Sequence, residues 1–95
     1  MYTIYVTYAA DSRKNLENFY NAIVEAGADK ACRAEADNIR YDYFWPADKE
    51  NELFLLEEWK SREAQKQHTT YDHFKKIGEL KEKYGIKSVF SDRDC

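Results

Sequence analysis

Glycine and proline are scarce in this chain, which has only three glycines and one proline in 95 residues. A loop that cradles the phosphates of a nucleotide needs closely spaced glycines, so neither a phosphate-binding loop nor a dinucleotide fingerprint is expected. No stretch is of low complexity, no linker divides the chain, and the length suits one domain over residues 1–95. We therefore expect a single domain that carries no nucleotide cofactor.

Cysteines and long apolar runs are also few. Cys32 and Cys95 have no spacing typical of a metal site or a redox pair, which favours two reduced thiols. No apolar run approaches the ~20 residues that cross a bilayer, and the first residues lack the basic segment of a signal peptide. The expectation is a cytoplasmic protein with no membrane partner.

An excess of positive charge is missing as well, since the net charge is −3 and the pI is near 5.4. Nucleic-acid binders usually carry a basic face. The lysines between residues 60 and 87 alternate with glutamates, which is typical of a solvated helix surface. No nucleic-acid partner is therefore expected, although the aromatic strands leave a sheet that stacks bases open as an alternative.

Apolar residues, in contrast, make up 43% of the chain and aromatics 16%, which is too much for a disordered segment. Runs of β-branched and aromatic residues predict four strands, over residues 2–8, 39–45, 52–59 and 86–91. Apolar residues at helical spacing predict three helices, over about 13–35, over 62–67, and from Thr69 or Thr70 to just before Gly85. A polar tail is expected over residues 92–95.

Several residues predict where the helices begin, end or pack. Asp11 or Ser12 is the expected N-cap of the first helix, and Ser61 that of the short one. Gly27 lies on the apolar face of the long helix, where its missing side chain suits close packing against the sheet. Asp37-Asn38 is expected to end that helix because both residue types tolerate left-handed backbone angles.

The predicted order β-α-β-β-α-β is that of the ferredoxin-like α+β fold, a four-stranded antiparallel sheet with helices on one face. The third strand has large apolar residues on both faces, with Leu53 and Leu55 on one and Phe54 and Leu56 on the other. Helices can cover only one of these faces. We therefore expect the second face to pack against the same face of another copy, in a homodimer.

Two histidines and one glutamate are candidates for proton transfer. His68 and His73 could move a proton near neutral pH, but spacing alone favours a surface or capping histidine for each. Their separation of five residues is poor for a shared metal, and no third ligand is apparent, so no metal site is expected. Glu57 lies between Leu55 and Trp59, where desolvation would raise its pKa, although a structural salt bridge or exposure near the sheet edge is the plainer interpretation.

An aromatic run on the second strand, together with Trp59 on the third, is a candidate pocket. These side chains could line a site for a flat aromatic substrate, or they could be plain core and interface. The run comprises Tyr41, Tyr43, Phe44 and Trp45.

Three segments resemble the antibiotic biosynthesis monooxygenase domain family, and the resemblance extends from Tyr2 to about Phe90. The segments are Asn-Ile-Arg-Tyr-Asp-Tyr-Phe (38–44), Leu-Phe-Leu-Leu-Glu-Glu-Trp-Lys-Ser (53–61) and His-Thr-Thr-Tyr-Asp-His-Phe (68–74). The resemblance implies a dimeric α+β barrel in which two sheets pack face to face, with an active-site cleft between sheet and helices. His68 matches the histidine that borders this cleft, and Trp59 matches an aromatic position there.

The resemblance also implies a chemistry. Members include cofactor-independent monooxygenases that act on quinols and phenols, so we expect a small phenolic substrate, molecular oxygen and no cofactor. His68 would be the catalytic base or donor, and the pocket would comprise Trp59, Tyr41, Phe74, Glu57 and His73. Haem degradation is not expected, because the first strand lacks the asparagine of haem-degrading members and Gly78 stands near the position of their histidine.

Two other functions remain open for the same cleft. One is an isomerase of a small phosphorylated, sugar-like metabolite, which would not consume oxygen and would need a cation such as Arg40 or Lys66. The other is a small-molecule-binding dimer without catalysis, which would have a closed or shallow cleft. The volume of the cleft and the side chains that reach it should help to separate these alternatives.

Overall fold

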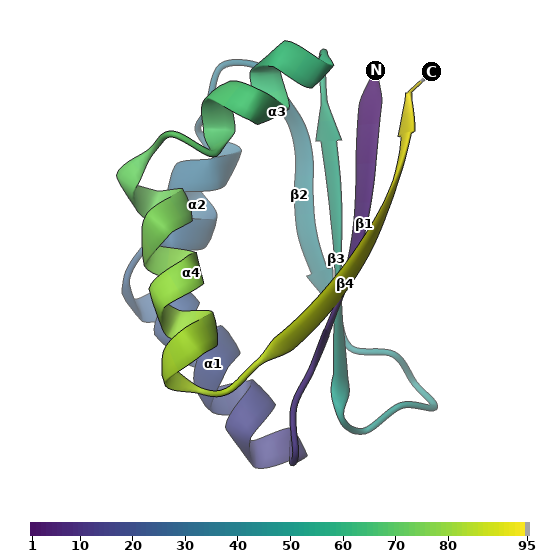
Figure 1. Ribbon diagram of the computed structural model, residues 1–95, viewed down its shortest axis with the longest axis vertical. Coiled ribbons are helices and arrows are strands. Elements are labelled where there is room, and N and C mark those ends of the chain that lie inside the picture. Colours follow the sequence, from purple (N-terminus) through teal and green to yellow (C-terminus); the bar gives the residue numbers. More distant parts are fainter. Residues whose placement is uncertain (95) are drawn as a thin grey trace.

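A single antiparallel sheet with all helices on one side forms the architecture (Figure 1). The computed structural model describes residues 1–94, so the expected thiol of Cys95 lies outside the described residues. The strands, in the spatial order β2-β3-β1-β4, are β1 (Tyr2–Ala9), β2 (Asn38–Phe44), β3 (Glu52–Trp59) and β4 (Lys87–Asp94). The helices are α1 (Arg13–Glu25), α2 (Ala28–Arg33), α3 (Arg62–His68) and α4 (Asp72–Lys83). The ferredoxin-like α+β prediction is confirmed.

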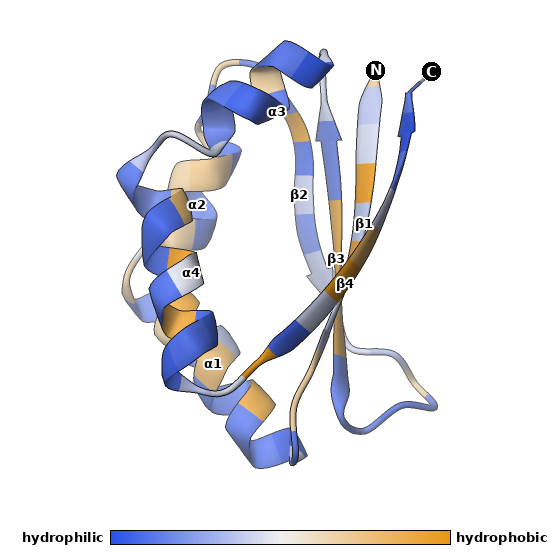
Figure 2. Cartoon of the chain, viewed as in Figure 1, coloured by the Kyte–Doolittle hydropathy of each residue, from blue (hydrophilic) through white to orange (hydrophobic). Residues whose placement is uncertain are grey.

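The core lies between the helices and one face of the sheet. Alternate residues of β1 and β3 point toward the helices and are buried, as the period of two in a strand requires. Leu16, Phe19 and Ile23 of α1 pack onto this face and are fully buried. Figure 2 shows apolar bands along the helices and the strands of the sheet. Burying a side chain of this size stabilises the fold by about 1.5–3 kcal/mol.

The other face of the sheet carries apolar residues that no helix covers. Tyr5, Phe54 and Phe44 form a row of rings across three strands, with centroids 6.3 and 6.1 Å apart. Leu56 lies on the same face, and Val89 at the β4 edge is 71% exposed. The strands are therefore apolar on both faces, as the sequence of β3 predicts.

The long helix predicted over residues 13–35 is two helices, which is a correction. Gly27 has φ 72°, in the left-handed region, and separates α1 from α2. Its expected close packing is also wrong, because a Cβ at this position would have no neighbour within 4 Å. Glycine is needed for the backbone angle, which other residues adopt only at a cost.

Asp37 and Asn38 end the helical region without left-handed angles, contrary to expectation, since no non-glycine among the described residues has a positive φ. The predicted polar tail is also partly wrong. Residues 92–94 belong to β4 and pair with β1, and Asp92 accepts a 2.7 Å hydrogen bond from the Tyr2 hydroxyl. Pairing with β1 gives these polar residues backbone partners on one side of the strand, which composition alone does not reveal.

Most of the other helix ends match the sequence. Ser12 and Ser61 are the N-caps of α1 and α3, as expected, and their hydroxyl oxygens accept backbone N–H bonds. Gly85, at φ 62°, follows α4, and its N–H donates to the Glu82 carbonyl at 3.2 Å. The N–H of Ile86 donates to the carbonyl five residues back, which completes a Schellman motif.

The expected threonine cap of α4 is wrong. The N-cap is Tyr71, which makes no side-chain cap. The hydroxyls of Thr69 and Thr70 instead donate back to carbonyls of α3, each at 2.7 Å. The two threonines therefore close the preceding helix, and the chain turns directly into α4. None of the helices within residues 1–94 is long and apolar enough to span a membrane.

Candidate active-site cleft

A cleft of about 190 Å³ opens between the sheet and the helices α3 and α4. Its floor is apolar and comes from β1, and its sides come from β3, β4 and both helices. The lining residues are Ile4, Val6, Tyr8, Glu57, Gln65, Phe74, Lys81, Ser88 and Phe90. The cleft is therefore not closed, which is one of the two forms expected for a non-catalytic module.

One wall of the cleft is aromatic and another is polar. Phe74 of α4 and Phe90 of β4 offer ring surfaces, as does Tyr8 on the floor. Lys81 lies one helical heptad after Phe74 and so shares its face of α4. Its Nζ donates to the Ser88 hydroxyl at 2.6 Å, which ties α4 to β4. The cleft can therefore hold a ring with a polar or anionic substituent.

Glu57 is the carboxylate that lines this cleft, and it is buried. Its side chain faces the helices from β3, and the residue is only 7% exposed. Burial raises the pKa of Glu57 to about 7, against a 3.1 Å hydrogen bond from the Trp59 indole N–H that lowers it, while the charge of Glu35 raises it further. The salt bridge considered as its plainer interpretation is absent, because no ion pair of residues 1–94 involves Glu57.

His68 lies behind the cleft and is 1% exposed, so its interpretation as a surface or capping histidine is wrong. Aromatic rings enclose it, with the Trp59 ring centroid 4.6 Å away and that of Phe74 5.2 Å away. Burial lowers the pKa of His68, against the hydrogen bond and charge of Glu35, which raise it. Phe74 thus contacts His68 and also lines the cleft, from which His68 itself is absent.

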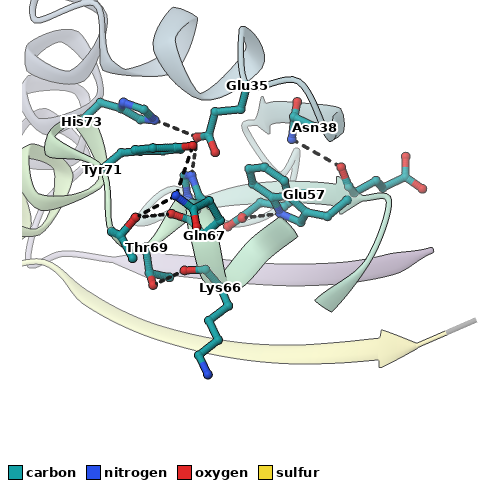
Figure 3. Close-up of polar contacts among 12 residues, drawn as sticks. Glu35, Asn38, Glu57, Lys66, Gln67, Thr69, Tyr71 and His73 are labelled. Carbon is teal, nitrogen blue, oxygen red and sulfur yellow. Dashed lines mark hydrogen bonds and ion pairs between the residues drawn. The ribbon is translucent and has the colours of Figure 1, made fainter. Parts of the chain in front are cut away.

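Glu35 joins the two histidines, and the sequence did not single it out. Its Oε2 lies 2.6 Å from His68 Nδ1 and 2.7 Å from His73 Nε2 (Figure 3). Cys32 completes the group, because one ligand-type atom from each of the four residues lies within 4.8 Å of all the others. Burial raises the pKa of the Cys32 thiol to about 12, and the residue forms no disulfide. Two further side chains of ligand type, Cys32 and Glu35, therefore lie beside the histidines, which spacing along the sequence did not reveal.

The predicted pocket residues therefore divide into two sets. Glu57 and Phe74 line the cleft, whereas Trp59, Tyr41, His68 and His73 form the layer behind it. Helical spacing from Phe74 could have located Lys81, but no sequence signal marks Gln65, Ser88 or Phe90.

The two cations considered for a phosphate lie elsewhere. Arg40 pairs with Asp42 at 2.7 Å and is exposed, and Lys66 is exposed on α3. Neither residue lines the cleft, whose cation is Lys81.

Sheet, helices and cleft together define a ferredoxin-like α+β domain with an enclosed carboxylate. Residues 1–80 match the family model described as antibiotic biosynthesis monooxygenase, and the chain belongs to this family. The resemblance seen in the sequence is thereby confirmed. No curated protein matches the chain significantly.

Solved structures share the fold at low sequence identity. A protein of Deinococcus radiodurans, described provisionally as an antibiotic biosynthesis monooxygenase, is 14% identical with a TM-score of 0.87, over 100% of this chain and 92% of its own. A Bacteroides thetaiotaomicron protein of unknown function, suggested to be an oxidoreductase, is 17% identical with a TM-score of 0.86, over 99% and 96%. A Nitrosomonas europaea protein, described provisionally as a monooxygenase of this kind, is 22% identical with a TM-score of 0.75, over 96% of both chains. At such identities the likeness shows the fold alone.

Proposed function

We propose that this chain is a monooxygenase that oxidises a small quinol or phenol with molecular oxygen, using Glu57 as the base. The observation that carries the proposal is a single carboxylate that is buried beside the apolar floor of a cleft and has no ion pair within residues 1–94. A base acts best when its pKa lies near the working pH, and burial brings the pKa of Glu57 to about 7. Membership of the family supports the same chemistry.

The size of the cleft limits the substrate. An apolar cavity of about 150 Å³ holds one benzene molecule, so about 190 Å³ suits one ring, or two where the second reaches the opening. Tyr8, Phe74 and Phe90 offer faces and edges for ring contacts. We therefore propose a quinol or phenol of one or two rings, not a larger polycyclic one.

The reaction needs a proton acceptor and a stabilised anion. Glu57 takes the proton of a substrate hydroxyl, and the electron-rich anion gives one electron to oxygen. The substrate radical and superoxide then combine into a peroxide. Loss of water completes the oxidation, so the substrate loses two hydrogens and gains one oxygen atom, and the second oxygen atom leaves as water.

The polar wall of the cleft supports the anionic steps. Lys81 offers a cation, and Gln65 and Ser88 offer an amide and a hydroxyl. Fixed donors in a cleft with few waters stabilise a developing negative charge more than water does. Glu57 and this wall would thus act on the same substrate, one as base and the other as anion stabiliser.

The catalytic role expected for His68 stays a prediction. Its ring is enclosed by Trp59 and Phe74, so a substrate in the cleft would meet Phe74 before it met His68. His68 would act on the substrate only if Phe74 moved. Glu57 needs no such movement, which is why we assign the base to Glu57.

We also propose that the chain works as a homodimer through the outer face of the sheet. Tyr5, Phe44 and Phe54 form a row of rings there, flanked by Leu56 and Val89. An apolar surface of this kind, spread over all four strands, is typical of an interface. A stable interface buries about 800 Å² on each partner, which one face of a small sheet can supply.

Oxygen uptake with a panel of one-ring and two-ring quinols tests the function. The wild type should consume one oxygen molecule per substrate, and Glu57→Gln should lose roughly a hundredfold or more of the rate, the usual contribution of a general base. Glu63→Gln, an exposed glutamate of α3, is the matched control and should keep full activity. Full activity of Glu57→Gln would refute its role, and loss only in His68→Ala would restore His68 as the base.

The isomerase remains the second candidate, because Lys81 places a cation in the cleft. Such an enzyme would bind a small anionic metabolite at Lys81 and use Glu57 to move a proton between adjacent carbons. It predicts turnover without oxygen, measured by proton exchange into the substrate from deuterated water. Deuterium incorporation under anaerobic conditions, with no oxygen uptake for any quinol, would favour it over the monooxygenase.

A further inference from the structure

Cys32, Glu35, His68 and His73 form a compact group of side chains behind the cleft, which we call the Cys-Glu-His-His cluster. They come from four places in the fold: α2, the turn after it, the last residue of α3 and the start of α4. One ligand-type atom from each lies within 4.8 Å of the others. Figure 3 shows the His73 ring and the Glu35 carboxylate pointing toward one another.

We propose that the Cys-Glu-His-His cluster is a binding site for one zinc(II) ion. Thiolate, imidazole and carboxylate are the three ligand types that zinc uses in proteins, and four of them in tetrahedral order complete its coordination. The mixture of soft and borderline ligands disfavours magnesium and calcium, which prefer oxygen alone. One thiolate and one carboxylate also balance the charge of a divalent ion, which suits a largely buried position.

The geometry requires only small movements. Tetrahedral zinc with ordinary bond lengths places its ligand atoms about 3.4–3.6 Å apart. The two nitrogen–oxygen contacts of Glu35, at 2.6 and 2.7 Å, would lengthen by about 1 Å or less, and the widest separation, at most 4.8 Å, would shorten by at most about 1.4 Å. Rotation of the side chains is enough for this, because Glu35 and His73 are only partly buried.

Zinc replaces protons in this cluster. Without metal, both histidines donate to one oxygen of Glu35, which is a complete hydrogen-bond arrangement. On binding, the Cys32 thiol releases its proton, and each histidine carries its remaining hydrogen on the nitrogen that does not face the ion. The Glu35 oxygen, which accepts hydrogen bonds from both histidines in the metal-free protein, then binds the metal instead.

A zinc ion with four protein ligands has no open position for substrate, so the site is structural. It ties α2 to the junction of α3 and α4, and it fixes His68, against which Trp59 and Phe74 pack. The zinc therefore supports the back wall of the cleft. A ligated histidine has no free electron pair, so this inference excludes His68 as the base, whereas the assignment of Glu57 does not depend on it.

Cobalt(II) titration of the metal-free protein tests the site directly, because cobalt reports its ligands by absorption. The titration uses the Cys95→Ser variant, in which Cys32 is the only cysteine. We expect one cobalt ion per chain, a thiolate-to-cobalt charge-transfer band, the intense visible bands of a four-coordinate ion, and loss of all of them when zinc(II) is added. Zinc alone should also raise the midpoint of thermal unfolding.

Single variants identify the ligands. Cys32→Ser should lose the charge-transfer band, and His73→Gln should weaken zinc binding roughly tenfold or more, the least that disturbing a zinc site usually costs. His73 is partly exposed and its glutamine variant should fold, which circular dichroism checks; Glu63→Gln is the matched control and should bind normally.

Three results would overturn the proposal: no stoichiometric cobalt spectrum, a charge-transfer band that survives Cys32→Ser, or unchanged zinc affinity in His73→Gln. Any of them would leave the cluster a hydrogen-bond arrangement only. The titration needs no turnover, so its failure is separate from a failure of the oxygen-uptake assay.

Discussion

Replacing Glu57 by glutamine should change the pH dependence of stability in a defined direction. The folded protein holds the pKa of Glu57 at about 7 by burial, against an ordinary value of 4.5 for the unfolded chain. Below pH 4.5 the Glu57 carboxyl is protonated in both the folded and the unfolded state, so it has no effect on stability. As pH rises from 4.5 through about 7, the unfolded state ionises first, so the free energy of unfolding falls.

The size of this fall follows from the shift. One pKa unit corresponds to 1.36 kcal/mol, so the displacement from 4.5 to about 7 costs the folded state about 3 kcal/mol once both states are ionised. Glutamine is nearly isosteric and uncharged, and its side-chain oxygen can still accept the Trp59 N–H. The free energy of unfolding of Glu57→Gln, relative to wild type, should therefore increase by about 3 kcal/mol between about pH 4 and about pH 8.

Urea unfolding at one fixed protein concentration, followed by tryptophan fluorescence, measures this difference. Trp59 is fully buried and should report the loss of structure. Glu63→Gln is the control and should parallel the wild type at every pH. A difference between Glu57→Gln and wild type that stays constant within about 1 kcal/mol would show that burial does not perturb Glu57, and would remove the physical basis of its role as base.

Three further predictions concern activity, backbone and assembly. The kcat/KM of oxygen uptake should rise with pH through about 7, as Glu57 becomes a carboxylate, and this rise should vanish in Glu57→Gln. Gly85→Ala should destabilise the protein by about 1 kcal/mol, because φ at this position is 62°. Gly78→Ala, inside α4, should instead stabilise it by about 0.5–1 kcal/mol, and thermal unfolding of the two variants and the wild type measures both effects. Leu56→Asp should convert a dimer into a monomer in light scattering, and an unchanged mass for this variant and the wild type would contradict the proposed interface.

Local rules explain why much of the fold was predictable. The four strands and the order of elements follow from period-two runs and helical spacing, which depend only on neighbouring residues. The roles predicted for Ser12, Ser61 and Gly85 are confirmed, because each residue makes a hydrogen bond to the end of the helix next to it. The helix boundary at Gly27 could not be predicted from spacing, since the apolar spacing continues through this residue while its left-handed backbone ends the helix.

Composition and pattern by themselves determined an α+β fold, a sheet with two apolar faces and a glutamate among apolar residues. These features follow from the sequence because the side chains of consecutive residues in a strand point to opposite faces. Only the tertiary structure decided that Glu57 opens into the cleft while His68 lies behind Phe74. It alone joined Cys32 and Glu35 to the two histidines, over more than thirty positions. Contacts of that range depend on how helices pack on the sheet, and no local spacing records them.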